Sequence, residues 1–199
     1  MIVSLAQAVT LLARGELVAY PTETVYALGA DAFQASALER LLAAKGRSAE
    51  RGLSLLIRDA EELARIAPGL PAAASRLAAR FWPGPLTLVV PVAEPAFALV
   101  ATPLGVGFRC SPQPSAAALA RAAAGPIVST SCNKSGEPPC ANAAEVEARF
   151  GRVLAILGGE PASGLAPSTV VAVAADGALR LVRAGDLDFA ALRSAAERD

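Results

Sequence analysis

Polar or charged residues directly follow several short apolar runs in this sequence. They are Thr22 to Thr24 after Tyr20, Arg109 after the run that begins at Val106, Ser129 to Asn133 after Val128, and Arg183 after Leu181. In open α/β sheets, ligands bind beyond the carboxyl ends of the strands. Hydroxyl groups, an amide and two guanidinium groups at such positions favour one shared site for an anion.

Two more cations follow a predicted helix over residues 35–44. They are Lys45 and Arg47, separated by Gly46. Lysine binds phosphate as a point charge, and arginine can bind two phosphate oxygens at once. The hydroxyl-rich run at Asn133 offers further donors to phosphate oxygens. The sequence contains neither a GxxxxGK[ST] loop nor a complete GxGxxG fingerprint, so neither common nucleotide-binding motif applies.

Each of these segments also has an ordinary structural explanation. Lys45 and Arg47 can be solvated residues after a helix, and the run around Asn133 is rich in residues that turns favour. β-Strands accommodate small hydroxyl residues as simple packing, and here those residues are Thr22, Thr24, Ser168 and Thr169. Arg109 is harder to explain in this way, because a buried guanidinium needs a polar or anionic partner.

The composition excludes several classes of function. The chain has 18 Lys and Arg residues against 18 Asp and Glu, and no histidine. A protein without net charge has no general field that attracts nucleic acid or an anionic membrane, so direct binding of nucleic acid is expected to be weak or absent. Without histidine, Ser-His-Asp and Cys-His catalysis and imidazole metal sites are excluded.

The cysteines and apolar stretches indicate a cytoplasmic protein. Cys110, Cys132 and Cys140 are odd in number and form no CxxC pair, which predicts neither a disulfide framework nor a zinc site. No histidine can activate them, so they are not expected to be nucleophiles. The N-terminal segment lacks a basic region and a long apolar core, and Glu94 and three prolines interrupt the apolar stretch 87–108. We therefore expect no signal peptide and no membrane span.

Hydrophobic periodicity predicts an α/β fold in which helices and strands alternate. Helices are predicted over 4–14, 35–44, from 59, over 71–81, 114–124 and 142–150, and from 188. Strands are predicted over 17–20, 53–57, 86–91, 106–110, 126–129, 153–157, 168–174 and 179–183, and residues 21–32 are predicted to be a loop. We expect a single domain over 1–199, with its core at about 4–183 and a terminal helix after 187.

Six segments occur in a fixed order along the chain: YPTETVYALGADA, KGRS, FWPGPLT, VGFRC, STSCNKSG and PSTVV. From Ser4 to Arg183 the chain closely resembles the YrdC-like family of threonylcarbamoyl-AMP synthases, in the short form without an extra C-terminal domain. The KxR…SxN signature of that family is met by Lys45, Arg47, Ser131 and Asn133.

The resemblance implies a twisted mixed sheet flanked by helices, with a concave and locally positive cavity. It also implies that threonine, bicarbonate and ATP form L-threonylcarbamoyl-adenylate and pyrophosphate. This is the first step of threonylcarbamoyl-adenosine modification of tRNA, and partner proteins complete the transfer. Mg²⁺ is expected to accompany the triphosphate.

The resemblance further assigns roles to individual residues. It places five at ATP: Lys45, Arg47, Ser131, Asn133 and Arg183. It places four around threonine: Thr22, Arg109, Ser129 and Ser168. The Arg109 guanidinium is the expected partner of the threonine carboxylate. No general base and no metal held by the protein are expected. The chain departs from the family pattern at Ser48, at Cys132 and in the loop after Arg109, and it lacks a histidine that some relatives have near the threonine site.

Two rival functions stay open on the sequence. One is an RNA-binding or ribosome-maturation module that uses the same basic cavity for backbone phosphate. The neutral charge and the scarcity of aromatic residues argue against a broad RNA surface. The other is a related carbamoyl-adenylate enzyme that does not use threonine, which the KxR…SxN residues do not distinguish.

Overall fold

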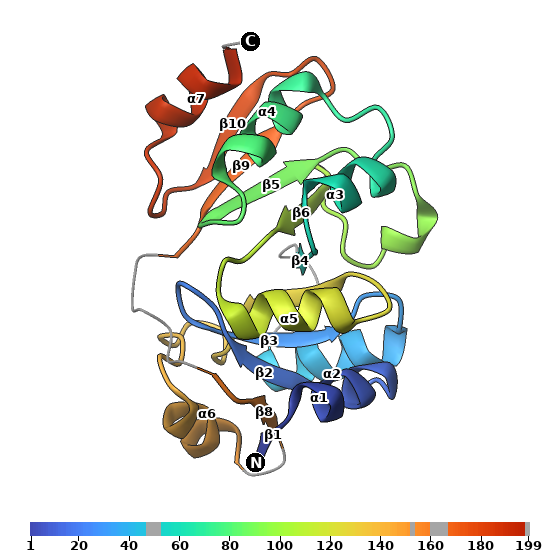
Figure 1. The fold of residues 1–199 in the computed structure, drawn as a ribbon, viewed down its shortest axis with the longest axis vertical. Coiled ribbons are helices and arrows are strands. Elements are labelled where there is room, and N and C mark those ends of the chain that lie inside the picture. Colours follow the sequence, from blue (N-terminus) through green and yellow to red (C-terminus); the bar gives the residue numbers. More distant parts are fainter. Residues whose placement is uncertain (47–52, 152–153, 160–166, 198–199) are drawn as a thin grey trace.

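The computed structural model describes residues 1–46, 53–151, 154–159 and 167–197. The described residues form one mixed sheet of ten strands in the order β1-β8-β2-β3-β7-β4-β6-β5-β9-β10. Strand direction rotates strongly from one end of the sheet to the other, and helices flank it (Figure 1). The predicted twisted mixed sheet flanked by helices is therefore confirmed.

The bounds of the elements agree with most of the predicted ones. The strands are β1 (Ile2–Val3), β2 (Val18–Pro21), β3 (Tyr26–Asp31), β4 (Ser54–Leu56), β5 (Leu86–Val90), β6 (Val106–Arg109), β7 (Ile127–Ser131), β8 (Ala155–Leu157), β9 (Thr169–Val173) and β10 (Leu179–Arg183). The helices are α1 (Leu5–Ala13), α2 (Ala35–Lys45), α3 (Ala60–Ile66), α4 (Ala72–Phe81), α5 (Pro114–Ala122), α6 (Ala143–Phe150) and α7 (Phe189–Glu197), with a 3-10 turn η1 over Pro95–Phe97.

Local capping signals mark the start of α1 and the end of α2. Ser4 and Gln7 form the predicted capping box at the start of α1, each side chain accepting from the other residue's backbone N–H. Helix α2 ends at Gly46, whose φ of 62° is left-handed and favours glycine. This ending places Lys45 in the last turn of α2.

The segment 21–32, which was predicted to be a loop, contains the central strand β3, so that prediction was wrong. β3 lies between β2 and β7 and runs antiparallel to both. Its sequence YALGAD is rich in small residues with weak strand preference. Tyr26, Leu28 and Ala30 pack into the larger apolar core, and this long-range packing stabilises the strand.

The apolar stretch 87–108 forms β5, η1 and β6 within the sheet. Among the helices in the described ranges, none has both the length and the apolar character needed to cross a bilayer.

Candidate functional site

The candidate site lies on one face of the sheet. Ser129 pairs with Ser54 on β4, Ser54 with Gly107 on β6, and Gly107 with Val89 on β5, so these residues share that face. On the same face, Ile127 belongs to a smaller apolar cluster that α1 and α5 complete. The two helices thus cover one part of the face, and the part over β4, β6, β5 and β9 is left for a cavity.

A cavity of about 740 Å³ occupies this uncovered part. Its floor includes the small residues Ala27, Ser54, Gly107 and Ser129, whose short side chains leave room above the strands. Seven of the nine residues that the resemblance assigned to substrates line it: Thr22, Arg109, Ser129, Ser131, Asn133, Ser168 and Arg183. The tertiary structure therefore brings both proposed groups of ligand residues to one place.

The two remaining residues differ in their situation. Arg47 lies outside the described residues. Lys45 is only 2% exposed and does not line the cavity. Its ammonium donates to the carbonyl of Ser131 at 2.5 Å, and to the carbonyl and side-chain Oδ1 of Asn133 at 3.1 and 3.2 Å. Lys45 thus fixes two cavity-lining residues, Ser131 and Asn133, without lining the cavity itself. Its contact with the triphosphate stays a prediction.

The segment around Asn133 is further fixed by its own hydrogen bonds. Ser131 Oγ donates to Asn133 Oδ1 at 2.5 Å. Asn133 Nδ2 donates to the carbonyls of Lys134 and Glu137 at 2.9 and 2.7 Å. Ser135 N–H donates to the carbonyl of Lys45 at 2.8 Å, which ties the segment back to α2. The protein's own hydrogen bonds therefore fix the positions of Ser131 and Asn133.

The turn between β2 and β3 approaches Arg109 from another part of the sheet. Arg109 Nη2 donates to the Glu23 carboxylate and, at 3.0 Å, to Thr24 Oγ1. Thr22 Oγ1 donates to the carbonyl of Val25 at 2.6 Å and lies 3.0 Å from Thr24 Oγ1. The expected polar partner of the buried arginine is therefore this turn of the protein itself.

A second cluster joins β5, β9 and β10. Arg183 donates from Nε and Nη2 to the carbonyl of Ser168 at 3.2 and 2.8 Å, and from Nη2 to Ser168 Oγ at 3.0 Å. Ser168 Oγ lies 2.9 Å from Thr87 Oγ1. Thr87 in turn pairs with Arg109 across β5 and β6. Residues assigned to ATP and to threonine thus form one continuous polar wall.

A β-bulge decides which face Arg183 occupies. Arg180 pairs with Ala172 and Leu181 with Val171, but Val170 pairs with Arg183 rather than with Val182. Strict alternation would put Arg180 and Arg183 on opposite faces of β10. The extra residue brings both arginines onto the cavity face, and both line the cavity.

The electrostatics of the cavity favour an anion. Partial burial lowers the pKa of the Arg183 guanidinium, and the positive charge of Arg109 lowers this pKa further. An anionic ligand between the two arginines would relieve this like-charge repulsion. Within the described residues, no group of three or more His, Cys, Asp or Glu side chains could hold a metal ion.

Among the polar residues that line the cavity, Thr87 and Arg180 were not singled out from the sequence. Thr87 carries a visible signal, since it is a polar residue inside the apolar run LTLVV. Arg180 has no such signal, because β10 is exposed along most of its length.

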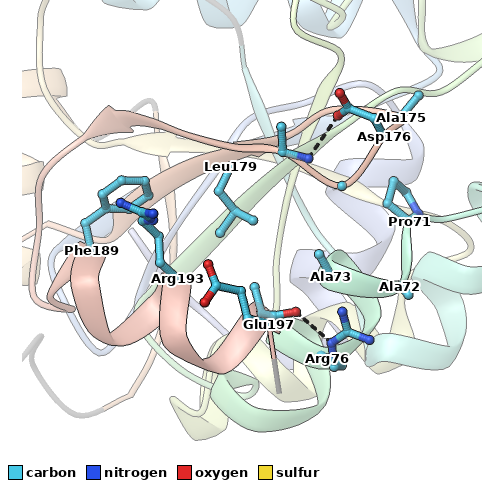
Figure 2. Close-up of a pocket in the computed structure, with 13 residues that line it drawn as sticks. Pro71, Ala72, Ala73, Arg76, Ala175, Asp176, Leu179, Phe189, Arg193 and Glu197 are labelled. Atoms are coloured by element: carbon cyan, nitrogen blue, oxygen red, sulfur yellow. Dashed lines mark hydrogen bonds between the residues drawn. The ribbon is translucent and has the colours of Figure 1, made fainter. Parts of the chain in front are cut away.

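A second hollow, of about 590 Å³, lies between α4, α7 and the turn from β9 to β10. Figure 2 shows Arg76, Asp176, Arg193 and Glu197 around it, with the apolar side chain of Leu179 among them and Phe189 beside Arg193. Arg76 Nε donates to the carbonyl of Ala196 at 2.8 Å. None of the described residues assigned to substrates lines this hollow, and its charges are mixed. The cavity on the sheet face is therefore the candidate site.

Comparison with known proteins gives relatives along nearly the whole chain. A threonylcarbamoyl-AMP synthase of Chromohalobacter salexigens is 41% identical over 169 residues, which cover 83% of this chain and 90% of the relative. A threonylcarbamoyl-AMP synthase of Bacillus subtilis is 38% identical over 175 residues, or 86% of this chain. The chain spans only 51% of that longer relative.

Solved structures agree with this result. The crystal structure of P. abyssi Sua5 complexed with L-threonine matches with a TM-score of 0.88 at 33% identity, over 98% of this chain and 60% of that one. The family model for the Sua5, YciO and YrdC proteins, described as "Telomere recombination", matches residues 10–185. With this match, and with a curated relative at 41% identity, the chain belongs to the Sua5/YciO/YrdC family.

Proposed function

We propose that this protein is an L-threonylcarbamoyladenylate synthase, a nucleotidyltransferase that uses L-threonine, bicarbonate and ATP and releases pyrophosphate. The observation that carries the proposal is the convergence of seven assigned residues from five separate segments on one cavity of about 740 Å³. The sequence similarity to threonylcarbamoyl-AMP synthases supports it.

The chemistry asks for positioning and charge neutralisation. The amine of threonine attacks the carbon of bicarbonate, a C–N bond forms and water is lost, and the product is a carbamate that is already an anion. A carbamate oxygen attacks the α-phosphorus of ATP, a new P–O bond forms, and the bond to pyrophosphate breaks. Such a step needs aligned reactants and cations near the developing charge rather than a titrating base. Arginines and hydroxyls in the cavity supply these groups, and no histidine is required.

Within the proposal, each side of the cavity has a separate task. We assign Ser131, Asn133 and Arg183, together with Lys45 and Arg47, to ATP. We assign Thr22, Arg109, Ser129 and Ser168 to threonine. The polar wall that joins Ser168 to Arg183 supports a shared boundary where the carbamate meets the α-phosphate.

The remaining assignments belong to the same proposal. Mg²⁺ enters as part of the MgATP substrate, bound through the phosphates. Residues 1–199 act as one YrdC-like domain in the cytoplasm, and tRNA-modifying partner proteins take over the adenylate. The balance of 18 basic against 18 acidic residues supports weak or absent direct binding of tRNA.

The decisive experiment is pyrophosphate release with threonine and bicarbonate omitted in turn. We expect release only when both are present with MgATP. Serine lacks the methyl group, which is worth about 1–3 kcal/mol in a pocket, so it should react roughly 10–200-fold more slowly than threonine. Valine should be slower still, because it leaves polar groups of the pocket unpaired.

The same assay separates the rival functions. Equal release with every amino acid, or activity with bicarbonate but without threonine, would favour a related carbamoyl-adenylate enzyme. An RNA-binding module would release no pyrophosphate, and it would bind tRNA tightly at physiological salt without any partner.

A further inference from the structure

Glu23 is a nearly buried acid that accepts hydrogen bonds from residues outside its own part of the sheet. It sits in the turn between β2 and β3, and its side chain is 13% exposed. One carboxylate oxygen, Oε1, accepts from Nη2 of Arg109, whose side chain is 11% exposed. The other oxygen, Oε2, accepts from Ser111 Oγ. Both oxygens are therefore used by residues at the end of β6.

This contact links segments that the sheet keeps apart. β7 and β4 lie between β3 and β6 in the strand order. Backbone pairing therefore does not join the β2–β3 turn to Arg109, and the side chains of Glu23 and Thr24 make this connection. Ser111 also accepts from the backbone N–H of Gln113 at 3.2 Å, so the partner of Glu23 is itself fixed.

The hydroxyl groups of Thr22 and Thr24 each donate one hydrogen bond within the turn, and this determines which oxygen can accept from Arg109. Thr22 Oγ1 donates to the carbonyl of Val25, so the 3.0 Å contact with Thr24 requires the Thr24 hydroxyl to donate to Thr22. Thr24 Oγ1 is then free to accept from Arg109 Nη2 at 3.0 Å. Two acceptors of one turn, Glu23 and Thr24, thus hold the same nitrogen of the guanidinium.

Unlike Nη2, the other two nitrogens of the Arg109 guanidinium make no hydrogen bond to the turn. Nε of Arg109 is buried and, within the described part of the chain, has no hydrogen-bond partner. Among the described residues Nη1 has no hydrogen-bond partner either, and Arg109 lines the cavity. A bidentate pair of hydrogen bonds to a carboxylate would use either Nε and Nη2 or Nη1 and Nη2. Both pairs include Nη2, which already donates to the turn.

We propose that Glu23 is a positioning residue that fixes the Arg109 guanidinium, so that Nη1 alone is presented to one oxygen of the substrate carboxylate. This role rests on the proposed function. Glu23 also balances the charge of Arg109, because an unpaired guanidinium at 11% exposure would be costly. Threonine is then held by a single charged contact from a guanidinium that does not have to reorganise when it binds.

Three variants test this role. Glu23→Gln keeps the size of the side chain and removes its charge, and Glu23→Asp keeps the charge on a shorter arm. Glu62→Gln is the matched control, because Glu62 is also a buried acid paired with an arginine, Arg58, with a side-chain exposure of 7%. Glu62 does not line the cavity. Pyrophosphate release is measured against threonine and against ATP, with the folded fraction checked by thermal unfolding.

We expect Glu23→Gln to raise KM for threonine at least about tenfold, with kcat and KM for ATP within roughly threefold of wild type. Glu23→Asp should recover part of the loss. Glu62→Gln should lower thermal stability and leave KM for threonine unchanged. If Glu23→Gln does not fold, Ser111→Ala replaces it and should raise KM for threonine by a smaller factor, roughly two to five.

Two results would overturn the role. An unchanged KM for threonine in a folded, less stable Glu23→Gln protein would mean that Glu23 serves stability alone. A lowered KM would mean that Glu23 competes with the substrate for Arg109. A wild-type protein without threonine-dependent pyrophosphate release would instead overturn the proposed function, and this role with it.

Discussion

The ammonium of Lys45 donates hydrogen bonds to both the carbonyl oxygen and the side-chain Oδ1 of Asn133, at 3.1 and 3.2 Å. The two residues are 88 positions apart in sequence. This contact joins the end of α2 to the loop after β7, and it makes the two halves of the KxR…SxN signature one structural unit. Within the proposed function, Lys45 acts on the nucleotide by fixing Asn133.

Replacing Lys45 by Met should destabilise the protein as well as impair its activity. Met keeps most of the length but leaves the oxygens of Ser131 and Asn133 without their charged donor. Since hydrogen bonds from charged groups contribute about 1.5–3 kcal/mol each, we expect a loss of roughly 2–4 kcal/mol in unfolding free energy. Activity at subsaturating ATP should fall at least about tenfold.

Urea unfolding and pyrophosphate release measure these two effects. The control is Lys134→Met, which makes the same substitution at an exposed lysine directly after Asn133. It should change neither quantity appreciably. Loss of activity in a Lys45→Met protein of unchanged stability would show that Lys45 acts on the phosphates directly rather than by holding the loop.

Arg180 should contribute to ATP binding although no motif identifies it. It shares the cavity face with Arg183 because of the bulge in β10, and phosphate oxygens attract both. Its side chain is exposed, so solvent screens the effect, and Arg180→Ala should raise KM for ATP only about 3–10-fold. The increase should shrink at high salt.

Steady-state kinetics at two ionic strengths tests this prediction. Arg65→Ala, on an exposed position of α3, removes an arginine outside the cavity and serves as the control. Equal KM values for ATP in wild type and Arg180→Ala would show that Arg180 does not reach the nucleotide.

Ionisation of the Cys110 thiol should lower the free energy of unfolding at alkaline pH. Burial raises the pKa of its thiol from 9.0 to about 11, and the negative charge of Asp59 adds to this. The folded state therefore binds this proton more tightly than the unfolded state does. The resulting stabilisation is complete below pH 9 and is lost as the pH rises from 9 to 11. With about 1.4 kcal/mol for each pKa unit, it amounts to roughly 2–3 kcal/mol.

The measurement is urea unfolding of wild type and Cys110→Ala at pH values on either side of this window. The stability difference between the two proteins should narrow at the alkaline end, because only wild type carries the titrating thiol. A difference that is independent of pH would contradict the raised pKa. Other groups titrate in both proteins and cancel in the comparison.

Cys132 should be dispensable for the chemistry although it lies inside the SxN segment. Its hydrogen bond with the Cys140 thiol raises the pKa of Cys132, and burial raises it further. The thiol is thus protonated at neutral pH and unsuited to attack. Cys132→Ala should keep kcat within about threefold and cost roughly 1–2 kcal/mol of stability through lost packing. A folded but inactive Cys132→Ala protein would point to covalent catalysis.

The sequence by itself determined much of this protein. The alternation of apolar runs and helical patterns identified nearly all the elements, and the Ser4–Gln7 pattern marked the start of α1. Ordered motifs singled out seven of the residues that line the cavity, because strand ends and turns carry their own local signals. These features depend on neighbours in the chain, so they can be recognised without the fold.

Only the tertiary structure decided the relationships across the sheet. It made β3 a strand between β2 and β7, buried Lys45 behind Asn133, and paired Glu23 with Arg109 over 86 positions of sequence. The bulge in β10 turned Arg183 to the cavity face against the simple alternation. These outcomes depend on strand pairing and side-chain packing between distant segments, and local propensity carries no information about which distant segment will be the partner.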